Sequence, residues 1–401
     1  MLLSWLYCTL FFGIGINFNS KIQFNCCTAD SFNRDVKNMS SSILKAISYA
    51  GVYVGAVIGA GYASGQEVLQ FFAGYGLVGI IGAILTTIMF IWYGSVFMEL
   101  GNRLQTCSHR DVLNYLCGNK LGFVGDYVLL FFMFGCVSIM FSGGGAAIHE
   151  YWGLPVIVGK LIIAAMTLAT VIFGFSSSVR ALGIVSPIII FSVIGISVIT
   201  LSSHFDQLST VDNSLQNLTP TLATPLWWTS AVVYVSYNVS LATSTLTAMG
   251  GKESSLKTLR QAGILGGFSL GLCLLFITVA LLSDLSNVIE YQIPFLQIAT
   301  NISPTIGILF SVVLVIAIFT TAVTNLYGCV IRFYDSHKHP ARFRTLTISL
   351  VALSLLASLF PFSTLINVLY PALGLLGMVI MVCALYKTLT GQVFLKDGAT
   401  L

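Results

Sequence analysis

The chain has 401 residues, of which 56% are hydrophobic and 8% are charged, and its mean hydropathy is +0.92. These values exclude a soluble globular domain, because uncharged stretches longer than the roughly 20 residues that cross a bilayer recur along the whole sequence. The formal net charge of +4 comes from basic residues in short loops. It therefore indicates membrane topology and gives no reason to expect nucleic acid as a partner.

Residues 1–38 form an N-terminal extension whose nature the sequence does not decide. Its apolar start resembles a short signal segment, but it lacks a positive region and a clear small-residue cleavage site. It could also be an extra helix, or translated upstream sequence with Met39 as the physiological start. We favour the last interpretation, because Met39 lies just before the first predicted span and a cleaved signal would leave the mature N-terminus outside, against the charge pattern.

Ten apolar segments follow, and they predict an all-α polytopic membrane protein. The predicted spans are residues 43–73, 77–100, 127–149, 155–173, 181–203, 222–249, 262–282, 304–331, 346–360 and 364–386. The last two are divided at Pro361, because the sequence from Arg344 to Lys387 carries no charge between its ends and must contain a turn.

The basic loop residues fix the predicted orientation. Lysines and arginines precede the first span and follow every even-numbered span, whereas the alternate loops carry only acidic residues. The positive-inside rule places both ends of the ten-helix core, including the 388–401 tail, in the cytoplasm.

The spans divide into two halves of similar length. Residues 39–203 hold spans one to five, residues 222–387 hold spans six to ten, and residues 204–221 form an external linker. Because five is an odd number, the second half enters from the opposite side of the membrane, which is the topology of an inverted repeat.

The first span is interrupted by Gly59, Gly61 and Gly65, and Gln66 and Glu67 follow directly. Broken helix is tolerated at membrane depth only where it is buried in protein or lines a cavity, so this combination predicts a binding site.

The two half-helices suggest what that site binds. The outer half is expected to start near Ser64, where free N–H groups could dock a carboxylate. The inner half is expected to end near Ile58, where free carbonyl groups could coordinate a cation. An amino acid or a related zwitterion fits this arrangement.

A matching break is expected in the sixth span at a polar cluster; the less favoured alternative is that these residues only bond neighbouring helices. The predicted substrate site comprises Gly59, Gly61, Tyr62, Ser64, Gly65, Gln66, Glu67, Ser236, Tyr237 and Asn238. Glu67 could bind a substrate amine, carry a coupling proton, or complement the dipole of the outer half-helix.

The string from Gly55 to Glu67, Gly-Ala-Val-Ile-Gly-Ala-Gly-Tyr-Ala-Ser-Gly-Gln-Glu, resembles the opening signature of the YkvI-like bacterial membrane proteins. These belong to the amino acid–polyamine–organocation superfamily. The resemblance covers about residues 40–387. It implies a LeuT-type five-plus-five fold with broken helices 1 and 6, in the bacterial cytoplasmic (inner) membrane. The group is poorly characterised, so the resemblance implies architecture more than substrate.

The same resemblance implies a sodium site between helices one and eight. The expected ligands are the carbonyls of Gly55, Ile58 and Ala317 and the hydroxyls of Thr320 and Thr321, since Ala317-Ile318-Phe319-Thr320-Thr321 matches the spacing A-x-x-[S/T]-[S/T]. Five neutral oxygens suit a hard monovalent cation. The alternative is that these threonines only bond within their own helix.

The sequence therefore predicts a secondary active transporter of a small organic solute, working by alternating access. Sodium is the first choice of coupling ion and a proton carried by Glu67 is the second, with no other cofactor and no enzymatic activity. Two alternatives remain, a solute-sensing receptor on a transporter scaffold (of the germinant-receptor kind) and an intramembrane enzyme. The sequence does not indicate an oligomeric state.

Overall fold

The structure is a computed structural model that describes residues 42–173, 175–215, 218–334 and 338–391. Every regular element in these ranges is a helix, which confirms the all-α class. The N-terminal extension and most of the predicted C-terminal tail lie outside the described residues.

Each predicted span from the second to the tenth falls on one helical element. These are α6 (Val78–Arg103), α7 (His109–Trp152), α8 (Val156–Phe173), α9 (Phe175–His204), α11 (Trp227–Gly250), α12 (Leu256–Ser283), α15 (Pro304–Ile331), α16 (Pro340–Ala357) and α17 (Phe362–Leu389). Helix α7 has a kink at Gly118, where φ is +79°, and the third span lies after this kink. Within the described residues, eight helices are long and apolar enough to cross a membrane, and α11 adds a 24-residue helix of lower hydropathy.

The first span is broken as predicted, and it is broken twice. It consists of α3 (Ser42–Val57), α4 (Ala60–Ser64) and α5 (Gln66–Phe71), followed by the 3₁₀ turn η1 (Ala73–Tyr75). Short helices occupy the connections between the long ones: η2 (Phe205–Ser209), α10 (Val211–Leu215), α13 (Leu285–Val288) and α14 (Pro294–Ile302).

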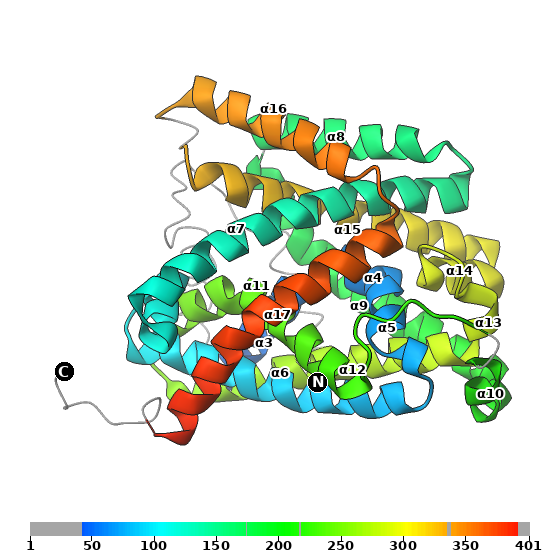
Figure 1. Ribbon diagram of the computed structural model, residues 1–401, viewed down its shortest axis with the longest axis horizontal. Coiled ribbons are helices and arrows are strands. Elements are labelled where there is room, and N and C mark those ends of the chain that lie inside the picture. Colours follow the sequence, from blue (N-terminus) through cyan, green and yellow to red (C-terminus); the bar gives the residue numbers. More distant parts are fainter. Residues whose placement is uncertain (1–41, 174, 216–217, 335–337, 392–401) are drawn as a thin grey trace.

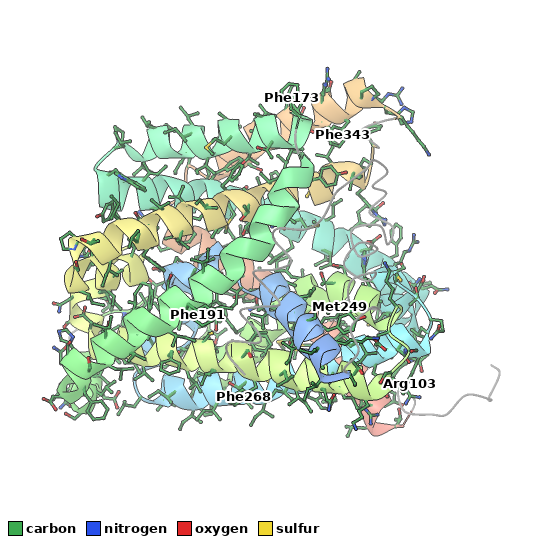
Figure 2. All side chains as sticks on the ribbon, turned by 180° about the vertical axis from the view of Figure 1, so that it is seen from behind. Arg103, Phe173, Phe191, Met249, Phe268 and Phe343 are labelled. Carbon is green, nitrogen blue, oxygen red and sulfur yellow. The ribbon has the colours of Figure 1, made fainter. Side chains whose placement is uncertain are left out.

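The helices are arranged in layers around the broken segment. In Figure 1, α6 and α12 lie together along one edge and α8 and α16 along the opposite edge, with α7, α15 and α17 crossing between them. The short helices α4 and α5 lie in the middle of the bundle. Figure 2 shows the opposite side, where α9 crosses obliquely over α12 and α15.

Ion pairs join described charged residues near the end of α6, the start of α12, the first part of α7 and the end of α15, and this part of the bundle is here called the basic end. Glu99 on α6 accepts hydrogen bonds from Arg103 at 2.7 Å and from Arg260 on α12 at 3.0 Å. Asp126 on α7 pairs with Arg332 at the end of α15. The positions of these residues therefore agree with the loop pattern read from the sequence. The side of the membrane on which the basic end lies stays a prediction, and so does the inverted repeat.

The expected break in the sixth span is wrong, because α11 is helical from Trp227 to Gly250 without interruption. The segment between these residues contains neither glycine nor proline. Its polar side chains bond within the helix, since Asn238 Nδ2 donates to the Tyr234 carbonyl at 2.9 Å and Ser240 Oγ donates to the Ser236 carbonyl at 2.7 Å. Serine and asparagine bonds of this kind leave the helix intact where no glycine permits a turn.

Helix α3 is held against α6 and α12 by one aromatic side chain. Tyr53 is fully buried and donates a hydrogen bond from its hydroxyl to the Phe90 carbonyl at 3.0 Å. Its ring lies between two glycines, because a Cβ on Gly94 would be 2.5 Å from Tyr53 Cε1 and one on Gly266 would be 2.6 Å from Cδ1. Small residues of this kind let membrane helices approach closely.

We therefore expect Gly94→Leu to destabilise the protein, because the new side chain would displace the Tyr53 ring from between α6 and α12. Overpacking of this kind costs about 1–3 kcal/mol. The matched control is Gly195→Leu on the exposed face of α9, where no atom lies within 4 Å of an added Cβ. Thermal unfolding of both variants in detergent should show a lower midpoint for Gly94→Leu only; equal midpoints would contradict the packing role of Gly94.

Candidate functional site

The backbone of the first span leaves the helical conformation at two points. The hydrogen-bond ladder of α3 ends with Ile58 N–H donating to Val54 at 2.8 Å, and the ladder of α4 begins with Ala63 N–H donating to Gly59 at 3.2 Å. The second interruption is Gly65, which has a φ of +78° and stands against Phe295 of α14. A left-handed φ with a neighbour so close suits only glycine.

The side chain of Glu67 lies inside this broken region. It is 5% exposed, and its Oε2 accepts a hydrogen bond from the hydroxyl of Tyr237 on α11 at 2.7 Å. The hydroxyl of Tyr370 on α17 lies beside the same carboxyl group. No lysine, arginine or histidine of the described chain forms an ion pair with Glu67, although a buried carboxylate is costly in a membrane without a partner.

Gly61 makes the room that the Glu67 carboxyl group occupies. A Cβ added to Gly61 would collide with Glu67 Oε1 and would lie 3.2 Å from the Tyr370 hydroxyl. The break, the glycine and the two tyrosines therefore act together to place one carboxyl group at the centre of the bundle.

Aromatic rings surround this carboxyl group on one side. The rings of Tyr237 and Tyr370 are stacked with centroids 4.7 Å apart and planes inclined by 16°. Phe132 of α7 stacks on Tyr370 at 5.9 Å, and Phe71 of α5 contacts Tyr237 at 5.8 Å. All four rings are buried, so the surroundings of Glu67 have a low dielectric constant.

The structure brings only part of the predicted substrate site together. Gly61, Glu67 and Tyr237 meet in the broken region. Ser236 instead donates to the Gly374 carbonyl of α17 at 2.5 Å, and Asn238 bonds within α11. These two residues follow the alternative interpretation, in which polar residues bond neighbouring backbone.

The remaining helix-one residues are placed around the second interruption. Tyr62 donates its hydroxyl to the Leu270 carbonyl of α12 at 2.8 Å, which anchors α4. Ser64 Oγ donates to the Gly61 carbonyl at 2.7 Å. Gln66 is buried, and its Oε1 has no hydrogen-bond partner among the described residues.

Two of the N–H groups expected to be free near the start of the outer half-helix are used inside the segment itself. Gly65 N–H donates to the Tyr62 carbonyl at 3.3 Å, and Gln66 N–H donates to Ser64 Oγ at 3.3 Å. The outer part does start a helix near Ser64, since α5 begins at Gln66 with Gly65 as its N-cap, and the five-residue helix α4 lies between the two interruptions. The left-handed φ of Gly65 ends α4 before a longer helix can form.

The residues of the expected cation site lie where α15 passes the first interruption. A Cβ on Gly59 would be 4.0 Å from Cγ2 of Thr321, so this threonine faces the break. Within the described residues, the carbonyls of Gly55 and Ile58 accept no backbone hydrogen bond from residues 59 and 62. Thr320 Oγ1 donates to the carbonyls of Ile316 at 2.9 Å and Ala317 at 3.0 Å.

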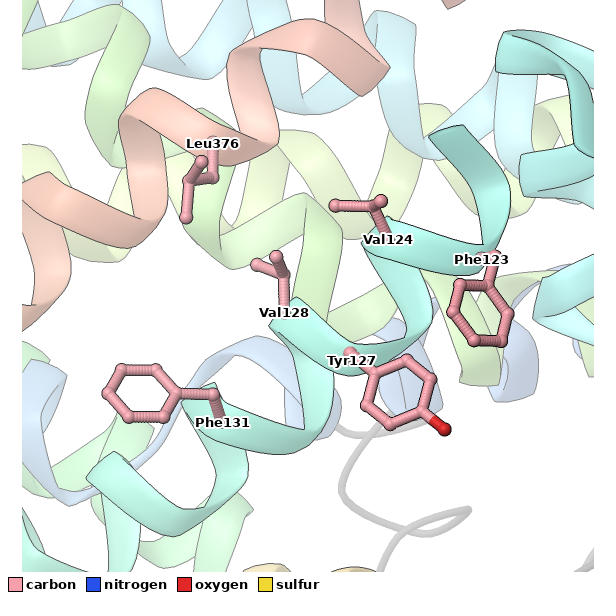
Figure 3. A pocket seen from close by; sticks show the side chains of 6 residues that line it. All are labelled: Phe123, Val124, Tyr127, Val128, Phe131 and Leu376. Carbon is pink, nitrogen blue, oxygen red and sulfur yellow. The ribbon is translucent and has the colours of Figure 1, made fainter. Parts of the chain in front are cut away.

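Two cavities lie beside α7 and α17, and they differ in character. The first, of about 320 Å³, is lined by apolar side chains that include Phe123, Tyr127 and Phe131, each at least half exposed at the outer surface (Figure 3). Such a surface suits lipid chains. The second, of about 180 Å³, lies between α7, α11 and α17; it runs from Cys117 near the basic end to Phe132 and Tyr237. It therefore ends at the ring whose hydroxyl binds Glu67.

Comparison with known structures defines the fold as that of LeuT-type transporters. MhsT in complex with L-phenylalanine superimposes with a TM-score of 0.56 at 16% identity, covering 88% of this chain and 92% of that one. A Na⁺-coupled sialic acid symporter in a substrate-bound outward-open state gives 0.58 at 14% identity, covering 94% and 85%. The inward-facing conformation of Mhp1 gives 0.54 at 13% identity, covering 87% and 78%.

Two relatives are similar in sequence over most of their length. The uncharacterized membrane protein YkvI of Bacillus subtilis (strain 168) is 27% identical over 349 residues, which is 87% of this chain and 98% of YkvI. The uncharacterized protein YyaD of the same strain is 27% identical over 332 residues, covering 83% and 94%. No family model matches the chain. The chain is similar to both proteins over most of its length, and the resemblance to YkvI expected from the glycine-rich string is confirmed.

Tyr370 and Phe132 are the site residues that sequence reasoning missed. Tyr370 had a detectable signal, because a tyrosine followed by Pro371 in the middle of an apolar span marks a place where the helix can depart from regularity. Phe132 had none, since it is one of 28 phenylalanines in an apolar chain.

We expect Gly61→Ala to abolish solute binding, because its Cβ would take the place of the Glu67 carboxyl group. Gly195→Ala on the exposed face of α9 is the matched control, since no atom lies within 4 Å of an added Cβ there. The measurement is the thermal stabilisation of each purified variant by the solutes that stabilise the unsubstituted chain. Retained stabilisation of Gly61→Ala would contradict a site in this region.

Proposed function

We propose that this chain is a secondary active transporter that moves a small organic solute across the membrane by alternating access, coupled to a cation. The observation that carries the proposal is the buried Glu67 carboxyl group at a broken helix, with no basic partner among the described residues. A costly polar group at this depth is retained where it contacts a solute or an ion.

An amino acid or a related zwitterion is the solute class to test first. A structural neighbour binds L-phenylalanine and another transports sialic acid, which are properties of those proteins. In this chain, Glu67 supplies a partner for an amino group, and the cavity that ends at Tyr237 supplies room on the side of the basic end.

Sodium is our first choice of coupling ion. The carbonyls of Gly55 and Ile58 accept no helical hydrogen bond from residues 59 and 62, and Cγ2 of Thr321 on α15 lies 4.0 Å from the place of a Cβ on Gly59. The Thr320 hydroxyl and the Ala317 carbonyl bond to each other and keep lone pairs that a cation can share. We further propose that the protein lies in the bacterial cytoplasmic membrane with the basic end in the cytoplasm.

A proton carried by Glu67 is the second choice. Uptake into proteoliposomes under an imposed sodium gradient and, separately, an imposed pH gradient distinguishes the two. Accumulation of no amino acid under either gradient would contradict the proposed transport of this class.

We expect Thr321→Val to reduce the apparent affinity for sodium by about tenfold or more, because valine keeps the shape of threonine and removes its oxygen. Thr324→Val is the control, since the Thr324 hydroxyl bonds to the Thr320 carbonyl within α15. The readout is the sodium concentration that gives half-maximal uptake or half-maximal thermal stabilisation. An unchanged value for Thr321→Val would refute this sodium site.

A further inference from the structure

The Glu67 carboxyl group lies inside the broken region in which the sequence predicted that a ligand's carboxylate binds. Its oxygens lie against Gly61 and receive the hydroxyl of Tyr237. The N–H groups of Gly65 and Gln66, which would have bound a carboxylate from outside, are bonded within the segment. The protein therefore supplies its own carboxyl group to this place, which is an anion whenever the group is ionised.

An anion in this position changes which ligand charge the site favours. A second carboxylate close to Glu67 would be repelled strongly, because like charges interact across a low-dielectric interior with little screening. An ammonium group would instead provide the missing opposite charge. Aromatic rings at this place act in the same direction, since the electron-rich faces of tyrosine and phenylalanine attract cations.

The cavity next to the site is suited to the rest of such a ligand. It is lined mainly by apolar side chains from α7, α11 and α17, and Phe132 and Tyr237 close the end that approaches Glu67. An aliphatic or aromatic group of modest size would be desolvated there, which is favourable for a hydrocarbon and unfavourable for a free carboxylate.

We propose that the site recognises the protonated amino group of its solute through Glu67, and that the solute class is small apolar amines for which an α-carboxylate is dispensable. This inference rests on the proposed function, because it assumes that the broken region binds the transported solute. It narrows the solute class, since a simple amine should bind better than the amino acid that has the same side group and an additional carboxylate.

The test compares ligands that share one side group. Thermal stabilisation of the full chain is measured with 2-phenylethylamine, L-phenylalanine, 3-phenylpropionate and 2-phenylethanol, and again with 3-methylbutylamine, L-leucine and 4-methylpentanoate. Each ligand is titrated in sodium and in a sodium-free salt. We expect the two amines to bind about tenfold or more tightly than the amino acids, and the acids and the alcohol to give no shift.

Variants then assign the effect to Glu67. Glu67→Gln keeps the shape of the side chain and should lose the stabilisation by amines. The control is Glu290→Gln, which makes the same change of charge at an exposed residue and should keep the stabilisation by amines. Tyr237→Phe keeps the charge and removes the hydroxyl, so it should retain the preference for amines over amino acids. Should Glu67→Gln not yield folded protein, Glu67→Asp serves in its place, with amine binding weakened by about tenfold.

The outcomes separate the inference from the function on which it rests. If amino acids bind as tightly as the amines, or if amine binding survives Glu67→Gln, the amine inference is wrong and transport of zwitterions stands. If none of these compounds binds and no amino acid accumulates in proteoliposomes, both the inference and the proposed function are overturned.

Discussion

The central constraint in this structure is a carboxyl group inside a membrane bundle that forms no ion pair with a basic residue of the described ranges. Glu67 can be there only because several features act together. Two helix interruptions bring its backbone to the centre of the bundle, Gly61 leaves the space for its oxygens, and Tyr237 donates a hydrogen bond. Removing any one of these features would leave a desolvated polar group unsatisfied, so they stabilise one another.

The continuous helix α11 changes how such a site is built. In place of two broken helices facing each other, one broken helix faces an intact one that contributes a side chain, Tyr237. The contribution of α11 to ligand binding therefore comes from the Tyr237 side chain, whose hydroxyl has one position. A broken helix would instead offer free backbone N–H and C=O groups. A second phenol, Tyr370 of α17, lies next to Tyr237. The helix α17 therefore contributes to the site, which the sequence had assigned to the first and sixth spans.

Much of the fold could be predicted from the sequence because lipid imposes simple rules. Hydropathy located each long helix, and Gly59, Gly61 and Gly65 marked the broken span. The break expected in the sixth span failed because polar residues alone do not interrupt a helix, and Ser236 and Asn238 found backbone acceptors. Glu67 and Tyr237 were predicted, but Tyr370 and Phe132 were not, since tertiary packing brings them near and a single span does not reveal its neighbours.

Gly65 connects two differently attached parts of the first span. Before it, α3 is held to α12 by the Tyr53 ring and α4 by the Tyr62 hydroxyl. After it, α5 is tied to α11 by Ser230, which donates to the Phe71 carbonyl at 2.8 Å, and to α17 by Gln70, which donates to the Ser363 carbonyl at 2.9 Å. A sliding of α12 relative to α17 would thus be taken up chiefly by the two backbone torsions of this glycine. Gly61 lies before Gly65 and Glu67 lies after it. The distance between Gly61 and the Glu67 carboxyl group would therefore change when α12 moves relative to α17.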